Sequence, residues 1–177
     1  MRTLVLGGVR SGKSVWAERA LADAPAVTYV ATAPNRPDDP EWTDRVAAHQ
    51  ARRPATWLTV ETGDIAGLLR DHTGPFLVDD LGNWLTRTID DCGAWSDRAR
   101  LATVRTHIDD LVTAWRGTTA RVIAVSNEVG SGVVPATYAG RLFRDEMGAL
   151  NTRLAAESDE VVLLVAGLPQ WLRSAER

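Results

Sequence analysis

The sequence predicts a single-domain α/β fold with a mainly parallel sheet flanked by helices. Short apolar, β-branched runs alternate along the chain with longer segments that have a helical pattern. The apolar runs are nearly continuous, as expected for strands that are covered on both faces. The length of 177 residues suits one domain that spans positions 1–177.

Five strands and five helices follow from this alternation. The strands are expected at 3–6, 27–31, 76–79, 122–126 and 161–166. The helices, which would supply the crossovers between parallel strands, are expected at 14–22, 42–53, 64–71, 97–116 and 138–157. The segment 33–41 contains three prolines and is expected to be a loop.

The charge and hydropathy of the chain exclude several classes of protein. The formal net charge is −3 and no basic block is present, which argues against a protein that binds nucleic acid or an anionic membrane. The apolar stretch 161–168 is far shorter than the roughly 20 residues of a membrane span. A single cysteine, Cys92, fits a reducing compartment. We therefore expect a cytoplasmic protein with no membrane span.

The stretch "GGVRSGKS" matches the phosphate-loop pattern G-x-x-x-x-G-K-[ST], directly after an apolar strand and directly before a helix. In such a loop, backbone amides hold a phosphate, Lys13 bridges the terminal phosphates and Ser14 ligates Mg²⁺. The alternative is a glycine-rich turn that matches the motif by chance. The flanking elements favour a nucleotide site on a P-loop NTPase-like, RecA-like fold. Its predicted residues are Gly7, Gly8, Val9, Arg10, Ser11, Gly12, Lys13 and Ser14.

Lys13 is also the only lysine of the chain. Lysine and arginine sum to 20, and the other 19 are arginine. A compact ammonium and a planar guanidinium are not interchangeable where a point charge must fit between phosphates. The composition therefore indicates a specific demand for lysine at this position.

A carboxylate for the metal is expected at the end of a neighbouring strand. The run "FLVDD" offers Asp79 and Asp80, and we favour Asp79 because the second aspartate falls in the turn that leads to "LGNWL". Either residue could instead be a turn former or a helix cap.

Two other strand ends open toward the same edge of a parallel sheet, where ligands bind in such folds. These are 31–33 and 126–135, and the second makes Asn127 and Glu128 candidate site residues. The alternative is that "NEVGSG" is only a loop with turn-forming glycines.

The histidine of "DRVAAHQARRP" has two possible roles. If 42–53 is helical, His49 falls on an apolar stripe bordered by Arg45, Arg52 and Arg53. His49 could be a packing residue, with arginines that interact favourably with the helix dipole. It could instead be a nucleophile that attacks phosphorus among phosphate-binding arginines. Spacing alone favours packing.

The remaining histidines, His72 and His107, are expected at the surface.

Several stretches in a fixed order resemble a known family. They are "GGVRSGKS", "YVATA", "RVAAHQARRP", the residues Trp57, Val60 and Glu61, "LVD", "VSNEVGSGVVP" and "FRDEMGALNTRLAAESDEV". Together they resemble the bifunctional adenosylcobinamide kinase/adenosylcobinamide-phosphate guanylyltransferase family of cobalamin biosynthesis, from about residue 2 to about residue 168. The chain departs from the usual pattern of that family at 80–83. Here "DLGN" replaces an uncharged residue followed by a threonine-containing turn.

The resemblance implies a two-step activity. The enzyme would phosphorylate adenosylcobinamide with ATP or GTP, and then transfer GMP from GTP to that phosphate through a guanylyl-histidine intermediate. By motif position His49 carries the GMP, and Lys13 is the second catalytic residue. The resemblance also implies a corrinoid substrate, a homotrimer, and Mg²⁺ on Ser14 and Asp79.

The nucleotide contacts that the resemblance adds to the phosphate loop are Ala31, Thr32, Ala33, Gln50, Ala51, Arg52, Arg53, Glu61 and Asp79.

Two other functions compete with this interpretation. One is an ordinary small-molecule phosphoryl transferase in which His49 is structural. The other is a nucleotide-binding switch or ATPase module that drives a conformational change and modifies no metabolite.

Overall fold

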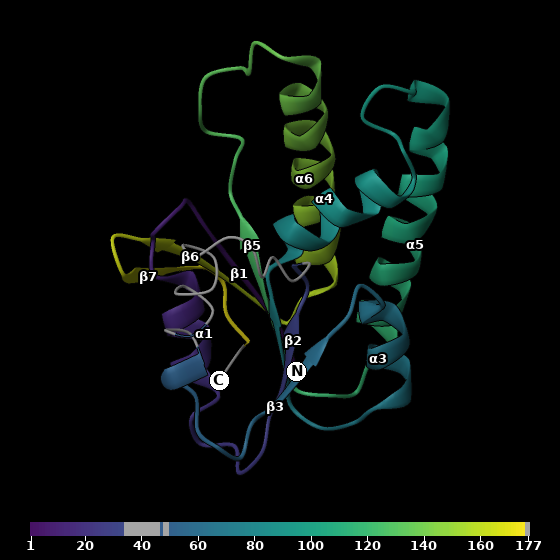
Figure 1. The fold of residues 1–177 in the computed structure, drawn as a ribbon. Coiled ribbons are helices and arrows are strands. Elements are labelled where there is room, and N and C mark those ends of the chain that lie inside the picture. Colours follow the sequence, from purple (N-terminus) through teal and green to yellow (C-terminus); the bar gives the residue numbers. More distant parts are fainter. Residues whose placement is uncertain (34–46, 48–49, 176–177) are drawn as a thin grey trace.

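The computed structural model describes residues 1–33, 47 and 50–175 (Figure 1). Its strands are β1 (Arg2–Gly7), β2 (Thr28–Ala31), β3 (Leu58–Glu61), β4 (Phe76–Asp79), β5 (Val122–Asn127), β6 (Glu160–Val165) and β7 (Leu168–Arg173). Its helices are α1 (Lys13–Ala20), α3 (Ile65–Asp71), α4 (Leu81–Asp91), the 3-10 helix η1 (Arg98–Arg100), α5 (Leu101–Gly117) and α6 (Tyr138–Glu157).

The strands of the described part form one seven-stranded sheet in the order β3-β2-β4-β5-β1-β6-β7. Every neighbouring pair is parallel except β6 and β7, which are antiparallel. The prediction of a single-domain, mainly parallel α/β fold is therefore confirmed.

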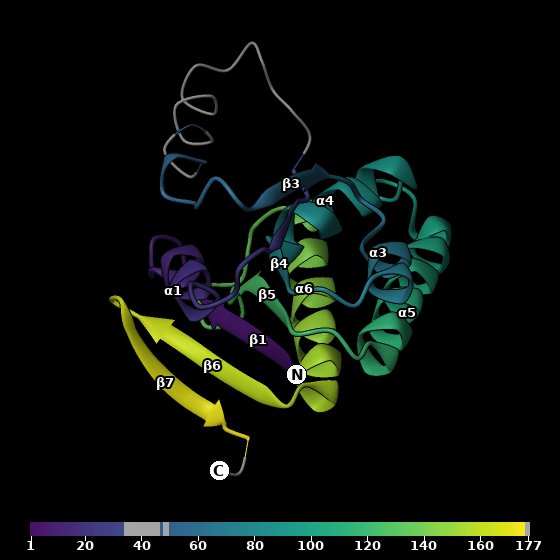
Figure 2. The same cartoon turned by 90° about the horizontal axis from the view of Figure 1, so that it is seen from below.

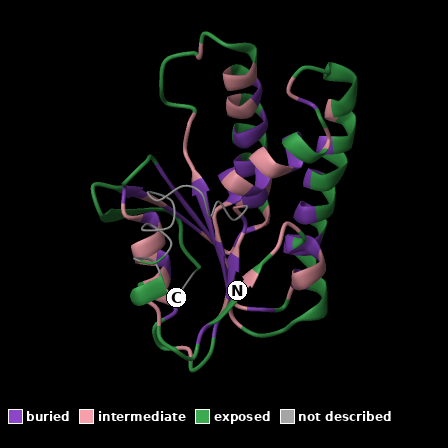
Figure 3. Ribbon diagram, viewed as in Figure 1, coloured by how far each residue is buried: buried purple, intermediate pink, exposed green. Residues whose placement is uncertain are grey.

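Helices cover both faces of the sheet. Figure 2 shows α1 on one face and α3, α4, α5 and α6 on the other. Two apolar clusters fill these layers. One joins α1 to the sheet through Ala17 and Leu21, and the other includes the fully buried Leu85 of α4 and Leu150 of α6. Figure 3 shows the resulting pattern, with the central strands buried.

The five predicted strands are present, and their ends agree within one residue. The prediction of only five was wrong, because the described sheet also contains β3 and β7. Both are edge strands. All six residues of β7 are exposed and three of the four residues of β3 are exposed, so neither has the continuous hydrophobicity that marked the central strands.

Helix α4 was also missed, because its first residues, "LGN", favour turns. The helix begins there because the Asp80 side chain accepts a hydrogen bond from the Asn83 amide at 2.6 Å. Helix α6 spans 138–157 as predicted, and α1, α3 and α5 differ from their predicted bounds by a few residues.

The predicted helix 42–53 and the predicted loop 33–41 lie largely outside the described residues. Of the first, Ala47, Gln50 and Ala51 are described as helical. Among the described residues, no helix has the length and apolar character needed to cross a membrane.

Replacing Thr137 tests whether its side chain stabilises the first turn of α6. The Thr137 hydroxyl accepts the Gly140 amide at 3.1 Å and so caps the helix. We expect Thr137→Ala to lower the free energy of unfolding by about 1 kcal/mol, measured by urea denaturation. Thr137→Ser keeps the capping oxygen and should stay close to the original protein. Equal losses in both variants would contradict the capping role.

Candidate functional site

The carboxyl ends of the parallel strands meet at one edge of the sheet. In the strand register, Glu61 of β3 pairs with Ala31 of β2, and Ala31 pairs with Asp79 of β4. Asp79 in turn pairs with Val125 of β5, beside the β1 strand that leads into the phosphate loop. Three of the predicted site residues, Glu61, Ala31 and Asp79, therefore lie level with one another.

The phosphate loop has two positions where a side chain would not fit. A Cβ on Gly7 would lie 2.5 Å from Ser11 Oγ and 2.7 Å from the Leu164 carbonyl oxygen. Gly12 has φ +93°, and a Cβ there would lie 3.3 Å from Gly167 Cα. The glycines of the motif are therefore required by close packing and by backbone conformation.

Distant parts of the chain hold this loop. The Gly167 amide, in the turn between β6 and β7, donates to the Ser11 carbonyl at 2.9 Å. The Glu128 amide donates to the Gly7 carbonyl at 3.0 Å. The buried Ser11 hydroxyl has no hydrogen-bond partner within the described part of the chain. Gly8, Val9 and Arg10 form the exposed rim of the loop.

Lys13 is buried at the start of α1, with 8% of its surface exposed. Its ammonium donates to the Gly8 carbonyl at 2.8 Å and thus folds back over the loop. Burial lowers the pKa of Lys13 below its usual value, and the nearby Asp80 and Asp79 carboxylates oppose this shift. A bound phosphate would likewise favour the charged form of this side chain.

Asp79 joins the phosphate loop to β2. One carboxylate oxygen accepts the Ser14 hydroxyl at 3.1 Å, and the other accepts the Tyr29 hydroxyl at 2.8 Å. Burial, followed by the negative charge of Asp79, raises the pKa of Tyr29 far above its usual value, so the phenol stays a donor. The sequence analysis missed Tyr29. Its hydroxyl reaches Asp79 only because β2 pairs with β4 in the sheet.

Ser14 and Asp79 offer oxygen atoms of the kind that Mg²⁺ prefers. Within the described residues, no group of three or more His, Cys, Asp or Glu side chains could hold a metal ion. Mg²⁺ usually takes only one or two protein ligands and completes its shell with water and phosphate oxygens. The hydroxyl and carboxylate, 3.1 Å apart, fit that mode of binding.

Asp80 caps the start of α4 and is also surrounded by site residues. The Thr32 hydroxyl donates to its carbonyl at 2.6 Å, and the Asn127 side-chain amide approaches its carboxylate at 3.5 Å. Burial raises the pKa of Asp80, and the hydrogen bond from the Asn83 amide opposes the shift. The side-chain amide of Asn151 on α6 fixes the Asn127 carbonyl at 3.0 Å, a contact that the sequence analysis missed.

The two candidates at the carboxyl end of β5 differ. Asn127 points its amide toward Asp80. The Glu128 carboxylate instead accepts the amides of Gly130 at 2.6 Å and Ser131 at 3.1 Å, bonds that lie within its own loop. For Glu128 these contacts support the alternative of a loop former.

The residues that follow His49 pack against α1 and the neighbouring strands. Arg52 forms an ion pair with Glu18 of α1 at 3.1 Å. The guanidinium carbon of Arg53 lies 3.6 Å from the centre of the Tyr29 ring, and this side chain also donates to Thr59 at 3.2 Å. Both predicted phosphate contacts therefore engage protein groups.

Gln50, Ala51 and Glu61 are exposed, and Ala33 is partly exposed. The predicted nucleophile His49 and its neighbour Arg45 lie outside the described residues.

A phosphate loop between a parallel strand and a helix, next to the Ser14–Asp79 pair, defines a P-loop nucleotide-binding α/β protein. A prototypical ATPase from the type III secretion system of pathogenic bacteria has the same fold, with a TM-score of 0.62 and 13% identity over 98% of this chain and 56% of that one. A family model described as "Cobinamide kinase / cobinamide phosphate guanyltransferase" matches residues 3–172. The chain belongs to this family of bifunctional transferases.

Curated relatives match this chain over nearly their full length. The bifunctional adenosylcobalamin biosynthesis protein CobP of Pseudomonas aeruginosa is 41% identical, covering 98% of this chain and 98% of that protein. The corresponding CobU proteins are 38% identical in Salmonella typhimurium and 35% in Escherichia coli, each covering 95% of this chain and 97% of the relative.

Replacing Gly82 tests the arrangement around Asp80. A Cβ on Gly82 would lie 2.5 Å from the Asn127 amide nitrogen and 3.3 Å from Asp80 Oδ1. We expect Gly82→Ala to lower kinase turnover by about tenfold or more, because displacements of about 1 Å in a site can cost up to about a hundredfold.

The matched control is Gly148→Ala on α6, where a Cβ would meet nothing within 4 Å. It should keep full activity and gain up to about 1 kcal/mol of stability. Full turnover in Gly82→Ala would show that the Asn127–Asp80 contact does not affect catalysis.

Proposed function

We propose that the protein phosphorylates the aminopropanol hydroxyl of adenosylcobinamide with ATP or GTP, and then transfers GMP from GTP to that phosphate. The products would be adenosylcobinamide-GDP and pyrophosphate. Family membership supports the pair of activities. The structural observation that supports it best is the contact of Ser14 with Asp79 beside a buried Lys13.

In the kinase step, the phosphate loop would bind the nucleotide phosphates. Lys13 would exchange its bond to the Gly8 carbonyl for phosphate oxygens, a small rotation of a side chain that already lies over the loop. Ser14 and Asp79 would hold Mg²⁺, which supplies positive charge that neutralises the phosphate oxygens. Tyr29 would keep the Asp79 carboxylate oriented through its 2.8 Å hydrogen bond.

In the guanylyl step, an imidazole nitrogen of His49 would attack the α-phosphorus of GTP. A phosphorus–nitrogen bond forms as the bond to pyrophosphate breaks. An oxygen of the cobinamide phosphate then attacks the same phosphorus and releases His49. Splitting the transfer in this way avoids one direct displacement between two large anions.

The anchoring of the segment after His49 supports this role. An ion pair with Glu18 attaches Arg52 to α1, the helix that follows the phosphate loop. Arg53 stacks on Tyr29, whose hydroxyl bonds the Asp79 carboxylate. Arg52 would contact a phosphate by exchanging the Glu18 carboxylate for it, since guanidinium binds both in the same bidentate way.

The nucleotide would contact the edge of the sheet formed by β1, β2, β3 and β4. Besides the phosphate loop, the proposed contacts are Ala31, Thr32, Ala33, Gln50, Ala51, Arg52, Arg53, Glu61 and Asp79. The register that aligns Glu61, Ala31 and Asp79 supports a ligand stretched along this edge.

Labelling with GTP that carries a tracer at the α-phosphate tests the proposed intermediate. We expect acid-labile, alkali-stable label on the protein without any corrinoid, as for a phosphoramidate. His49→Ala should lose the label and keep kinase turnover.

Lys13→Ala is the second arm of this experiment. It should lower both kinase turnover and labelling by about a hundredfold or more, because the same ammonium would stabilise phosphate charge in both steps. Label that persists in His49→Ala, or full kinase turnover in Lys13→Ala, would refute the corresponding assignment.

We further propose that residues 1–177 act as one catalytic domain in a cytoplasmic homotrimer. Large apolar side chains lie open at the surface of the single chain, among them Val133 with 95% and Leu168 with 72% of the surface exposed. Contiguous exposed apolar residues mark interaction surfaces, and Val133 is followed by the exposed Val134.

Equilibrium sedimentation should give three times the chain mass of 19.2 kDa. A concentration-independent monomer would contradict the proposed trimer and leave the proposed chemistry in place.

A further inference from the structure

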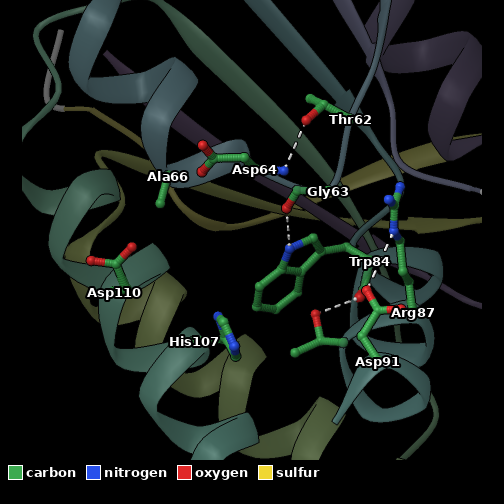
Figure 4. A pocket seen from close by; sticks show the side chains of 10 residues that line it. Thr62, Gly63, Asp64, Ala66, Trp84, Arg87, Asp91, His107 and Asp110 are labelled. Atoms are coloured by element: carbon green, nitrogen blue, oxygen red, sulfur yellow. Dashed lines mark hydrogen bonds and ion pairs between the residues drawn. The ribbon is translucent and has the colours of Figure 1, made fainter.

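A cavity of about 430 Å³ lies between α3, α4 and α5 (Figure 4). Figure 4 shows the indole of Trp84 in its centre, with His107 and Asp110 of α5 on one side and Arg87 and Asp91 of α4 on the other. The phosphate chemistry described above uses none of these side chains. The volume lies within the range of small-molecule sites, about 300 to 1,000 Å³.

The cavity adjoins the nucleotide edge of the sheet. Thr62, in its lining, directly follows Glu61 of β3, which lies two strands from Asp79 in the register. Two strand spacings correspond to about 10 Å. From the other side, α4 begins after Asp80, and the Trp84 amide bonds the Asp80 carbonyl at 3.2 Å. The cavity thus lies one turn of α4 from Asp80 and about two strand spacings across the sheet from Asp79.

The lining combines an aromatic wall with several hydrogen-bonding groups. The Trp84 indole is buried and fixed by a 2.9 Å bond from its nitrogen to the Gly63 carbonyl. Arg87 and Asp91 form an ion pair of 3.7 Å. Three carboxylates belong to the lining: Asp91 pairs with Arg87, Asp110 pairs with Arg70 of α3, and Asp64 accepts the Gly67 amide. With both arginines counted, the lining keeps a small excess of negative charge.

We propose that this cavity binds one amide-bearing edge of the corrin macrocycle, and this inference rests on the proposed function. Cobinamide is a large cation surrounded by primary amides, each of which both donates and accepts hydrogen bonds. An acidic lining with carboxylates, a guanidinium and hydroxyls can bind such amides, and the indole wall can cover the apolar ring edge. The volume suits an edge of the macrocycle and leaves the remainder outside.

The substrate can reach the phosphate site from this position. The arm between the macrocycle and the reactive hydroxyl has about as many bonds as two peptide residues, so it spans about 7 Å. Together with the ring edge, this length is comparable with the two strand spacings, about 10 Å, that separate Glu61 from Asp79. The phosphate end of the nucleotide, on the phosphate loop, and the arm of the corrinoid would then meet near Asp79.

Filling the cavity tests the assignment. His107 is exposed on α5, so His107→Trp adds an indole without disturbing the core. We expect the KM for cobinamide to rise about tenfold or more, which is about 1.4 kcal/mol of binding. The kinase kcat, the KM for GTP and the labelling of the protein by GTP alone should not change. Equilibrium dialysis with cobinamide and no nucleotide should show the same weakening in Kd.

Thr113→Trp is the matched control on the same helix. Thr113 is exposed and lines a different cavity of about 320 Å³, so the same indole should leave the cobinamide KM and Kd unchanged. An unchanged Kd in His107→Trp, or equal weakening in both variants, would overturn the assignment. Absence of label in the unmodified protein would refute the guanylyl intermediate, and dialysis would still decide the role of the cavity.

Discussion

The hydrogen bond between Ser14 and Asp79 is the contact around which the site is organised. It joins the start of α1 to the end of β4, although β5 lies between β4 and β1 in the sheet. Tyr29 holds the second oxygen of the same carboxylate. The next residue, Asp80, starts α4, whose side chains line the proposed corrinoid cavity. The end of one strand therefore determines where both substrates would lie.

The sequence predicted those parts of the structure that have a local signature. The phosphate loop is a contiguous motif, and Asp79 could be placed beside it because parallel strands end at one edge. Tyr29 and Asn151 were missed because their contacts join residues 50 and 24 positions apart, and no spacing rule marks them. The strands β3 and β7 were missed because they lie at the edges of the sheet, where burial no longer imposes an apolar pattern.

The chain departs from the usual family pattern at residues 80–83. The contacts of these residues fit together. A buried carboxylate is costly unless hydrogen bonds compensate it. Asp80 receives the Asn83 amide within its own helix and the Asn127 side chain from β5. The absence of a side chain at Gly82 leaves the space that the Asn127 amide occupies. Asp80, Gly82 and Asn83 therefore support one another within this segment, and the departure is compatible with the arrangement of the site.

The turn between β6 and β7 has a consequence for how the protein is made. The Gly167 amide bonds the Ser11 carbonyl, so residues near the end of the chain support a loop near its beginning. During synthesis on the ribosome, the phosphate loop emerges early and its support emerges late. An incomplete chain thus lacks the packing that shapes its nucleotide site. The phosphate loop of a growing chain therefore obtains this support only after β6 and β7 have emerged and paired.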